Sequence, residues 1–372
     1  MDDENKNAGA SFAENQKENA SCWRKTAIVL SLLAAVFVLI AAGIGLFIWY
    51  SGSVHGSMFA ARGGKLTDSV QPAETTAPAE PEKPIDADWI DEEGNAYNYR
   101  DDIISILLMG VDYMSEKSHW ENGMISNGGN SDVLALVILN TSSFDFSVLY
   151  IPRDTMADVL VTDEAGNYIN TIYTNIATAH SYGDGKELSC ELTADAVSRL
   201  LYGVPINRYA ALSYDSIYRL SDILGGVTIT FDADYSRINP SFTEGATVTL
   251  SSWQLYRFIV YRDKSQAEGA YERGVRDMLV LKAVFDQCKD RIAEDPATAL
   301  DILTELDSYL TTNLDIREIS YLAQNIGKLD FCSNTVIKLP GEVKMGETYA
   351  EFYPDKDWLH DFVADTFCRK IS

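Results

Sequence analysis

The stretch ISILLMGVD, residues 104–112, decides the fold of this chain. An apolar run without regular polar alternation is typical of a strand that lies in the middle of a sheet and is covered by helices on both faces. The stretches SDVLALVILN, residues 131–140, and DFSVLYIPRD, residues 145–154, repeat the pattern. Three such strands predict a layered domain built around a central sheet.

Helical patterns surround these strands. Helices are predicted within residues 191–203, 214–224, 250–263 and 272–295, and a strand follows Gly225-Gly226. The predicted fold is therefore an α/β (α+β) three-layer sandwich, a central mixed sheet covered by helices. Residues 291–372 are predicted as a mainly helical C-terminal extension, with a strand near TVIKLP (335–340).

The N-terminal region predicts a membrane anchor. Residues 1–25 are polar and typical of a disordered tail, whereas residues 26–50 carry no charge and are long enough for a transmembrane helix. A cleaved secretory signal is the alternative, but the run exceeds the usual apolar core of a signal peptide. Arg24 and Lys25 precede the run, so the positive-inside rule predicts a single-pass cell-membrane protein with a cytoplasmic N-terminus and an extracytoplasmic C-terminal domain.

Residues 51–85 are rich in Pro, Ala, Glu and Thr and predict an extended linker, so the folded domain is expected over residues 86–372. Near its start, EEGN (92–95) is typical of a hairpin turn. The acidic residues there lack the spacing of an EF-hand calcium loop.

Composition and missing motifs exclude several functions. The chain has 55 Asp and Glu against 30 Lys and Arg, a net charge of −25, which disfavours nucleic acid as a partner. It has no Walker A motif, no GxGxxG after a strand, no HExxH and no CxxC. Disulfides and buried thiols both remain open for the cysteines that follow the apolar segment: Cys190, Cys288, Cys332 and Cys368. No Cys-His or Ser-His-Asp arrangement is predicted, which leaves carboxylates and arginines as the chemical groups.

Aspartates mark the ends of the predicted strands. Asp112 follows the first strand and Asp132 opens the second, so an antiparallel pair would bring both carboxylates to one edge of the sheet. Two adjacent carboxylates repel one another unless a cation or a proton lies between them, and Mg²⁺ suits two carboxylates together with phosphate oxygens. The alternative is that both residues only cap turns.

Arginines form a second set. Arg153 lies beside Asp154 after the third strand, Arg262 ends FIVYRD, and Arg273 and Arg276 share one face of a helix. Because arginine binds phosphate bidentately, their convergence would indicate a phosphate-rich ligand. Solvated salt bridges with the abundant acidic residues are the alternative for each arginine.

The order of these pieces resembles the LytR-CpsA-Psr family of bacterial cell-envelope proteins. The stretches that carry the resemblance cover most of residues 103–290: ILLMGVD, NSDVLALVILN, VLYIPRDT, LLYGVPINRYAALSYDSIYRLSDILGGVTITF and LYRFIVYRDKSQAEGAYERGVRDMLVLKA. The resemblance implies a membrane-anchored phosphotransferase that moves a glycopolymer from a polyprenyl pyrophosphate carrier to peptidoglycan.

The resemblance also implies roles for individual residues. It assigns Mg²⁺ binding to Asp112 and Asp132 and pyrophosphate binding to Arg153, Arg262, Arg273 and Arg276. Arg153 and Asp154 are the expected catalytic pair, in which Asp154 either orients Arg153 or accepts a proton. An apolar groove for the polyprenyl tail has Leu220 and Ile223 as candidates, although plain core is the simpler role for both.

The chain also departs from the family pattern. The departures are Asn130 and Val260 in place of arginines, Ala270 in place of an aspartate, Asp277 in place of a glutamine, and a Gly/Asn-rich insertion at residues 119–130. Fewer cations would weaken pyrophosphate binding. A second hypothesis follows, that of an inactive relative which binds polyprenyl-phosphate lipids as a cell-envelope scaffold.

Overall fold

The structure of this chain is a computed structural model. It describes residues 87–112, 120–121, 124–125, 129–163, 165–213, 216–262, 269–294, 302, 304–325, 329, 331, 335–347 and 349–371. The predicted tail, transmembrane segment and linker lie outside these residues, as does Cys332. Within the described ranges, no helix combines the length and the hydrophobicity that a bilayer span requires.

A six-stranded mixed sheet forms the centre of the fold, as predicted, and its strands run in the order β13-β10-β3-β6-β7-β14. Their bounds are β13 Leu310–Thr312, β10 Arg208–Ser213, β3 Ile103–Val111, β6 Ser131–Asn140, β7 Phe146–Ile151 and β14 Val336–Lys338. The three apolar stretches of the sequence are adjacent here as β3, β6 and β7, and almost all of their side chains are buried. Burial on both faces explains why these stretches lack polar alternation.

The directions of the strands decide which ends meet. β6 is antiparallel to both β3 and β7, whereas β10 runs parallel to β3 and β14 runs parallel to β7. The C-terminal ends of β3 and β7 therefore flank the N-terminal end of β6 at one edge of the sheet.

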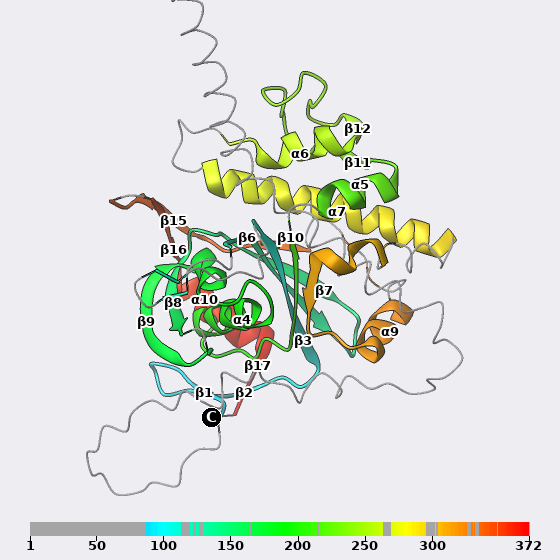
Figure 1. Cartoon of the computed structure of the whole chain (residues 1–372). Helices are drawn as coiled ribbons and strands as arrows, with labels where there is room; N and C mark the ends of the chain where they lie inside the picture. The colour runs from blue at the N-terminus through cyan, green and yellow to red at the C-terminus, as the bar shows by residue number, and fades with distance from the viewer. Residues whose placement is uncertain are drawn as a thin grey trace, which may run out of the picture.

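Helices cover both faces of the sheet (Figure 1). On one face lie the 3-10 helix η2 (Ile176–Tyr182) and α4 (Glu187–Leu200), and Ser131 donates a hydrogen bond to the carbonyl of Ala177 there. On the other face α7 (Gly269–Glu294) crosses β7, and α5 (Ser216–Leu224) and α6 (Ser252–Val260) pack beside it. A capping box of Ser251 and Gln254 begins α6.

The C-terminal region differs from its predicted form. Residues 291–372 do contain α9 (Ile316–Asn325) and α10 (Lys356–Phe367), but they also supply both outer strands of the central sheet, β13 and β14. β14 is the strand expected near TVIKLP, whereas β13 pairs antiparallel with β10 through a short Leu-Thr-Thr segment. The helices of this part of the chain are therefore accompanied by strands that the sequence analysis did not predict.

Small two- and three-stranded sheets surround this core. β1 (Trp89–Ile90) and β2 (Ala96–Tyr99) form the hairpin predicted around EEGN, with Gly94 at a φ of 85°, and β17 (Cys368–Lys370) pairs with β2. The other pairs are β4 (Trp120–Glu121) with β5 (Met124–Ile125), β8 (Met156–Thr162) with β9 (Tyr168–Asn175), β11 (Val227–Thr230) with β12 (Thr247–Leu250), and β15 (Gly341–Met345) with β16 (Ala350–Pro354).

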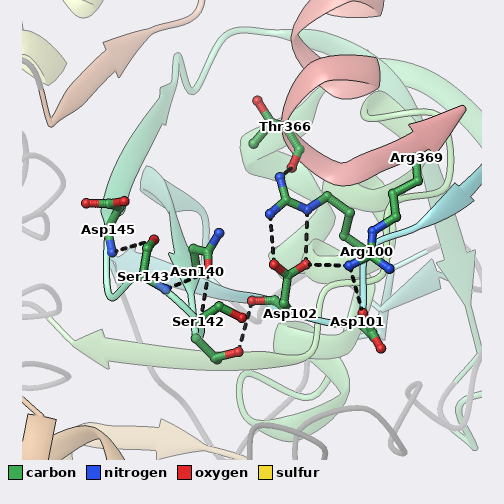
Figure 2. Close-up of polar contacts among 10 residues, drawn as sticks. Arg100, Asp101, Asp102, Asn140, Ser142, Ser143, Asp145, Thr366 and Arg369 are labelled. Carbon is green, nitrogen blue, oxygen red and sulfur yellow. Dashed lines mark hydrogen bonds and ion pairs between the residues drawn. The ribbon is translucent and has the colours of Figure 1, made fainter.

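At the edge of the sheet where β3 begins, polar contacts join the two ends of the domain (Figure 2). Arg100 binds Asp102 through two hydrogen bonds, Nε to Oδ1 at 3.0 Å and Nη2 to Oδ2 at 2.9 Å. Arg369, from β17, reaches Asp101 and Asp102 at 3.3 and 3.4 Å. The side chain of Asn140 accepts hydrogen bonds from the backbone of Ser142 and Ser143 and closes the turn between β6 and β7.

Candidate functional site

The opposite edge of the sheet gathers the residues singled out in the sequence. Asp112 follows β3, Asp132 is the second residue of β6, and Arg153 lies two residues beyond β7. The antiparallel pairing that the sequence suggested for the two aspartates is confirmed, and β7 adds Arg153 at the same edge.

A β-bulge sets the direction of Asp132. Gly110 pairs with Val133 and Val111 pairs with Ser131, so Asp132 is an extra residue in β6. Ser131 contacts η2 on one face, while Asp132 contacts Arg273 of α7 on the other. Uninterrupted alternation along β6 would have placed Asp132 on the η2 face, so the bulge brings its carboxylate to the α7 face.

Two arginines share the carboxylate of Asp132. Arg153 donates from Nη1 to Oδ1, and Nη2 of Arg273 lies 3.6 Å from Oδ2. The Asp132 side chain is fully buried and Arg273 is 2% exposed, whereas about a quarter of the Arg153 side chain, 26%, is open to solvent. Arg153 is therefore the most exposed member of this cluster.

A glycine allows α7 to approach the sheet closely enough for this contact. A Cβ at Gly274 would lie 1.8 Å from the hydroxyl oxygen of Tyr150, a fully buried residue of β7. Arg273, the preceding residue, is thereby held against Asp132.

Asp154 is placed to orient Arg153. Its Oδ1 lies 3.3 Å from Nε of Arg153 and accepts a hydrogen bond of 3.3 Å from Nδ2 of Asn175. Its carbonyl accepts a hydrogen bond from the backbone of Phe352, which anchors β16 beside the site. Since this carboxylate already has two polar partners, the geometry favours an orienting role.

The electrostatics of Arg153 indicate how close the charged groups lie. Desolvation lowers the pKa of the Arg153 guanidinium, and the positive charges of Arg273 and Arg262 lower it further, while Asp154 and Asp112 act in the opposite direction. Arg262 is exposed after α6, yet its charge reaches this cluster. At the end of β3, Oδ1 of Asp112 accepts a hydrogen bond of 2.5 Å from the backbone N–H of Asn130.

Arg276 is close to the cluster but makes different contacts. Its guanidinium donates to the carbonyl of Tyr261 and lies 5.8 Å from the centre of the Tyr261 ring. Arg276 is 6% exposed, and desolvation lowers the pKa of its guanidinium. The positive charge of Arg273 lowers this pKa further. The predicted arginines are thus brought together, with Arg153 and Arg273 in direct contact with Asp132.

Buried polar atoms without hydrogen-bond partners concentrate in this region. Among the described residues they include Oδ2 of Asp132, Nε of Arg273, Nε of Arg276 and both carboxylate oxygens of Asp277. Burial raises the pKa of Asp277 from 3.8 to about 7, against the opposing charges of Arg273 and Arg276. Buried charged groups with unused hydrogen-bonding capacity are typical of functional sites.

The carboxylates fit a hard divalent cation in a limited way. The described residues contain no group of three or more His, Cys, Asp or Glu side chains that could hold a metal ion. Asp112 and Asp132 end adjacent strands, and Oδ2 of Asp132 lacks a hydrogen-bond partner. Two carboxylates suit Mg²⁺ when phosphate oxygens and water complete its shell.

The departures from the family pattern fall in or near this site. Asn130 pairs with Asp112 through the backbone, Val260 is the last residue of α6, and Asp277 is fully buried on α7. The side chain of Ala270 and half of the residues of the insertion at 119–130 lie outside the described part of the chain.

Two other expectations can now be placed. Leu220 is 2% exposed and Ile223 is half-buried against the same core, so both are packing residues of α5.

The sequence analysis predicted no Cys-His arrangement. In the structure, however, Sγ of Cys190 lies 3.9 Å from Nε2 of His180. Both residues are fully buried, and burial raises the pKa of the Cys190 thiol well above its usual value, so this pair is not a nucleophilic site. Cys190, Cys288 and Cys368 are free thiols.

Sequence reasoning missed several residues that shape the site. Tyr150 and Gly274 carried no local signal for their contact, and Asn175 lies in a mostly exposed strand, β9, that was not singled out. The bulge at Asp132 is likewise invisible in an apolar run.

Comparisons with known proteins point to one family. The LytR_cpsA_psr family model matches residues 66–364. The polyisoprenyl-teichoic acid–peptidoglycan teichoic acid transferase TagU of Bacillus mycoides is 26% identical over 239 residues, which make up 64% of this chain and 69% of that protein.

Solved structures share the fold. Protein gbs0355 from Streptococcus agalactiae superimposes with a TM-score of 0.54 at 18% identity, covering 71% of this chain and 87% of that one. TagT bound to LI-WTA superimposes with a TM-score of 0.52 at 21% identity, covering 71% and 89%. With a family model matched over most of its length and a mixed sheet flanked by helices, the chain belongs to the LytR-CpsA-Psr family.

Proposed function

We propose that this protein transfers a glycopolymer from a polyprenyl pyrophosphate carrier to peptidoglycan. The observation that carries the proposal is the meeting of Asp112, Asp132 and Arg153 at one sheet edge, with Arg273 reaching them from α7. The name of the Bacillus mycoides relative, a teichoic acid transferase that acts on peptidoglycan, supports the same class of reaction.

In the proposed reaction a peptidoglycan hydroxyl attacks the phosphorus that carries the glycopolymer. A new P–O bond forms, the P–O bond to the bridging oxygen breaks, and polyprenyl phosphate leaves and takes up the proton that the attacking hydroxyl loses. Arg153 and Arg273 would bind the diphosphate oxygens and stabilise the negative charge on the leaving phosphate, because guanidinium groups pair with phosphate bidentately. Asp154 would hold the Arg153 guanidinium in place.

Asp112 and Asp132 would hold Mg²⁺, which supplies Lewis-acid neutralisation of phosphate oxygens. Charge balance supports this assignment. Both oxygens of Asp132 face arginines, so part of the positive charge of Arg153 and Arg273 is already neutralised by protein carboxylates. A cation on the carboxylates would free those arginines for the diphosphate.

We further propose that the apolar segment 26–50 anchors the protein in the cell membrane with the folded domain outside. A substrate with a polyprenyl tail is itself embedded in the bilayer, so a tethered enzyme meets it in two dimensions. The long linker, residues 51–85, would let the site reach from the membrane surface to the wall.

A second candidate function has its own support. Asn130 and Val260 stand where the family pattern has arginines, and Asp277 adds a carboxyl group beside Arg273 and Arg276. A protein with these substitutions could bind polyprenyl-phosphate lipids as a scaffold without transferring their cargo.

One experiment separates the two functions. The full chain is placed in lipid nanodiscs and incubated with a polyprenyl pyrophosphate-linked saccharide and peptidoglycan fragments, with Mg²⁺ or with EDTA, and released polyprenyl phosphate is measured. We expect Mg²⁺-dependent release that falls on the order of 10²–10³-fold in Asp132→Asn. Asp195→Asn, which breaks an Asp-Arg pair on α4, is the matched control and should retain full activity. Lipid binding without release in the wild type would establish the scaffold instead.

A further inference from the structure

Two hairpins of this domain are closed by the same kind of turn. DEEGN (91–95) joins β1 to β2, and DEAGN (163–167) joins β8 to β9. In each turn, Oδ1 of the aspartate accepts hydrogen bonds from the backbone N–H groups two and four residues later, and Oδ2 accepts one from the asparagine side chain. Gly94 and Gly166 have φ values of 85° and 80°. The two turns can therefore be compared directly.

The first turn has an additional partner, His360 of α10. Nε2 of His360 lies 3.3 Å from Oδ2 of Asp91, an oxygen that also accepts a hydrogen bond of 3.2 Å from the hydroxyl of Tyr97. The Asp91 side chain is 1% exposed and the His360 side chain is 30% exposed. This contact fastens the hairpin at the start of the described domain to the last helix, although the two residues are 269 positions apart.

Both ring nitrogens of His360 face carboxylates. Nδ1 lies 3.3 Å from Oδ1 of Asp361, while Nε2 faces Asp91. An ionised carboxylate only accepts hydrogen bonds, and a neutral imidazole has a single N–H group. The neutral ring can therefore satisfy one of the two contacts, whereas the protonated ring satisfies both. Burial lowers the pKa of His360, but the hydrogen bonds and charges of Asp361 and Asp91 outweigh it and raise this pKa above its ordinary value.

Aromatic rings hold His360 against the hairpin. The ring of Trp89, in β1, stacks between Tyr97 and Tyr202, with centroid distances of 4.8 and 5.3 Å. The imidazole ring lies 5.1 Å from Trp89 and 6.2 Å from Tyr202. Because Trp89 and Tyr97 belong to the hairpin, the position of the imidazole is coupled to the packing of β1 and β2.

Other titratable groups surround this contact, but they do not change charge in the same pH range. They come from the turn, β2, the residues after α4, α10 and β17, and are Glu92, Glu93, Tyr97, Tyr202, Asp357, Cys368 and Lys370. Burial raises the pKa of both tyrosines and of the thiol. An imidazole is the only one of these side chains whose ordinary pKa lies between pH 5 and pH 8.

We propose that the contact of His360 with Asp91 is a proton-controlled clasp, closed while His360 is charged, that fastens the first hairpin to α10. The raised pKa in the folded protein means that the clasp is complete below about pH 6.5 and is lost as the pH rises through the folded value. β2 remains paired with β17 in either state, so the clasp governs β1 and the turn (Figure 1). The predicted linker, residues 51–85, leads into β1, so opening would lengthen the tether.

Hydrogen–deuterium exchange of the full chain in nanodiscs tests the clasp at pH 6 and pH 8, with each rate divided by the intrinsic rate at that pH. Protection of residues 89–97 should fall on the order of threefold from pH 6 to pH 8, the effect of one partly exposed ion pair. His360→Gln should abolish this fall, because glutamine does not ionise. Residues 163–167 are the matched control within the same molecule. They form the same turn without a histidine, so their protection should be equal at both pH values.

Two results would overturn the proposal: no fall in protection of residues 89–97 in the wild type, or an equal fall in the wild type and His360→Gln. Thermal unfolding checks that the variant is folded. Should His360→Gln fail to fold, Asp361→Asn takes its place, since that side chain is 80% exposed. With one acceptor fewer, this variant should lose protection at a lower pH than the wild type, and an unchanged pH would also overturn the proposal.

Discussion

The two edges of the central sheet use the same residue types in opposite ways. At one edge Arg100 and Asp102 form a two-point pair, which raises the pKa of Arg100 and lowers that of Asp102 (Figure 2). At the other edge Asp132 is shared by two arginines, and the pKa of Arg153 is lowered. The exposed fractions of the two arginine side chains are similar, 24% and 26%. Desolvation by the surrounding protein is the main cause of the difference at Arg153, and the like charges of Arg273 and Arg262 add to it.

The largest expected effect comes from replacing Arg153, the exposed cation at the edge of the sheet that holds Asp132. Arg153→Ala should reduce transfer on the order of 10²–10³-fold, because the charge on the leaving phosphate loses its nearest guanidinium. Arg100→Ala, at the opposite edge, should leave transfer within about threefold and lower the unfolding temperature instead. Rates and thermal unfolding of both variants check the comparison, which fails if Arg100→Ala slows transfer as much as Arg153→Ala.

The close approach of α7 gives the next effect. In Gly274→Ala the added Cβ would collide with the buried Tyr150, so the helix or the ring must move, at a cost of about 1–3 kcal/mol in unfolding free energy. The movement would draw Arg273 from Asp132 and also slow transfer. Gly346→Ala is the control, since the nearest atom there is the carboxylate oxygen at the end of the Glu351 side chain. Denaturant unfolding should show a clear loss for the first variant and little for the second.

Asp277 gives a smaller effect that depends on pH. Because its pKa is raised to about 7 in the folded protein, the unfolded chain loses this proton near pH 4 while the folded protein retains it. Stability should therefore fall as pH rises from about 4 to about 7. Asp277→Asn removes this loss and should gain on the order of 1–2 kcal/mol relative to the wild type between pH 5 and pH 8. A stability difference between the two proteins that stays constant over this range would show that Asp277 is ionised throughout.

The smallest effect is expected at the exposed member of the structural edge. The Arg369 side chain is 62% exposed, and it contacts Asp101 and Asp102 at 3.3 and 3.4 Å. Arg369→Ala should change the unfolding free energy by less than about 0.5 kcal/mol, since solvent screens such pairs. A loss above about 2 kcal/mol would mean that this contact, rather than the hydrogen bonds from Arg100 to the carbonyls of Thr366 and Phe367, holds the ends of the domain together.

The sequence predicted the centre of the fold well, for a physical reason. β3, β6 and β7 are buried on both faces, and strands buried in this way have apolar residues at most positions, which the sequence shows. The positions of Asp112 and Asp132 relative to their strands were enough to predict a common edge. Family resemblance then supplied the expected roles of the arginines, which stay predictions.

The remainder depends on contacts that no local pattern encodes. β13 is only three residues long and half-buried, so its pairing with β10 is decided by the tertiary structure. Lys338 lines a pocket together with Arg276, although the two residues lie far apart in the chain. The residues next to Lys338 in the sequence give no indication of a site. Tyr150 is likewise an ordinary strand residue in the sequence, and only its contact with Gly274 of α7 gives it a role near the site.

Because β6 contains an extra residue, deletion of a single residue next to Asp132 would change the direction of its carboxylate. A substitution at that position would leave the direction unchanged. Shortening β6 by one position at Ser131 would restore regular alternation and turn the carboxylate toward η2, with every side chain chemically intact. Among relatives of this chain, a gap of one residue before the aspartate would therefore mark a lost site even where the aspartate itself is kept. Alignments that slide such a gap into the neighbouring loop would hide the loss.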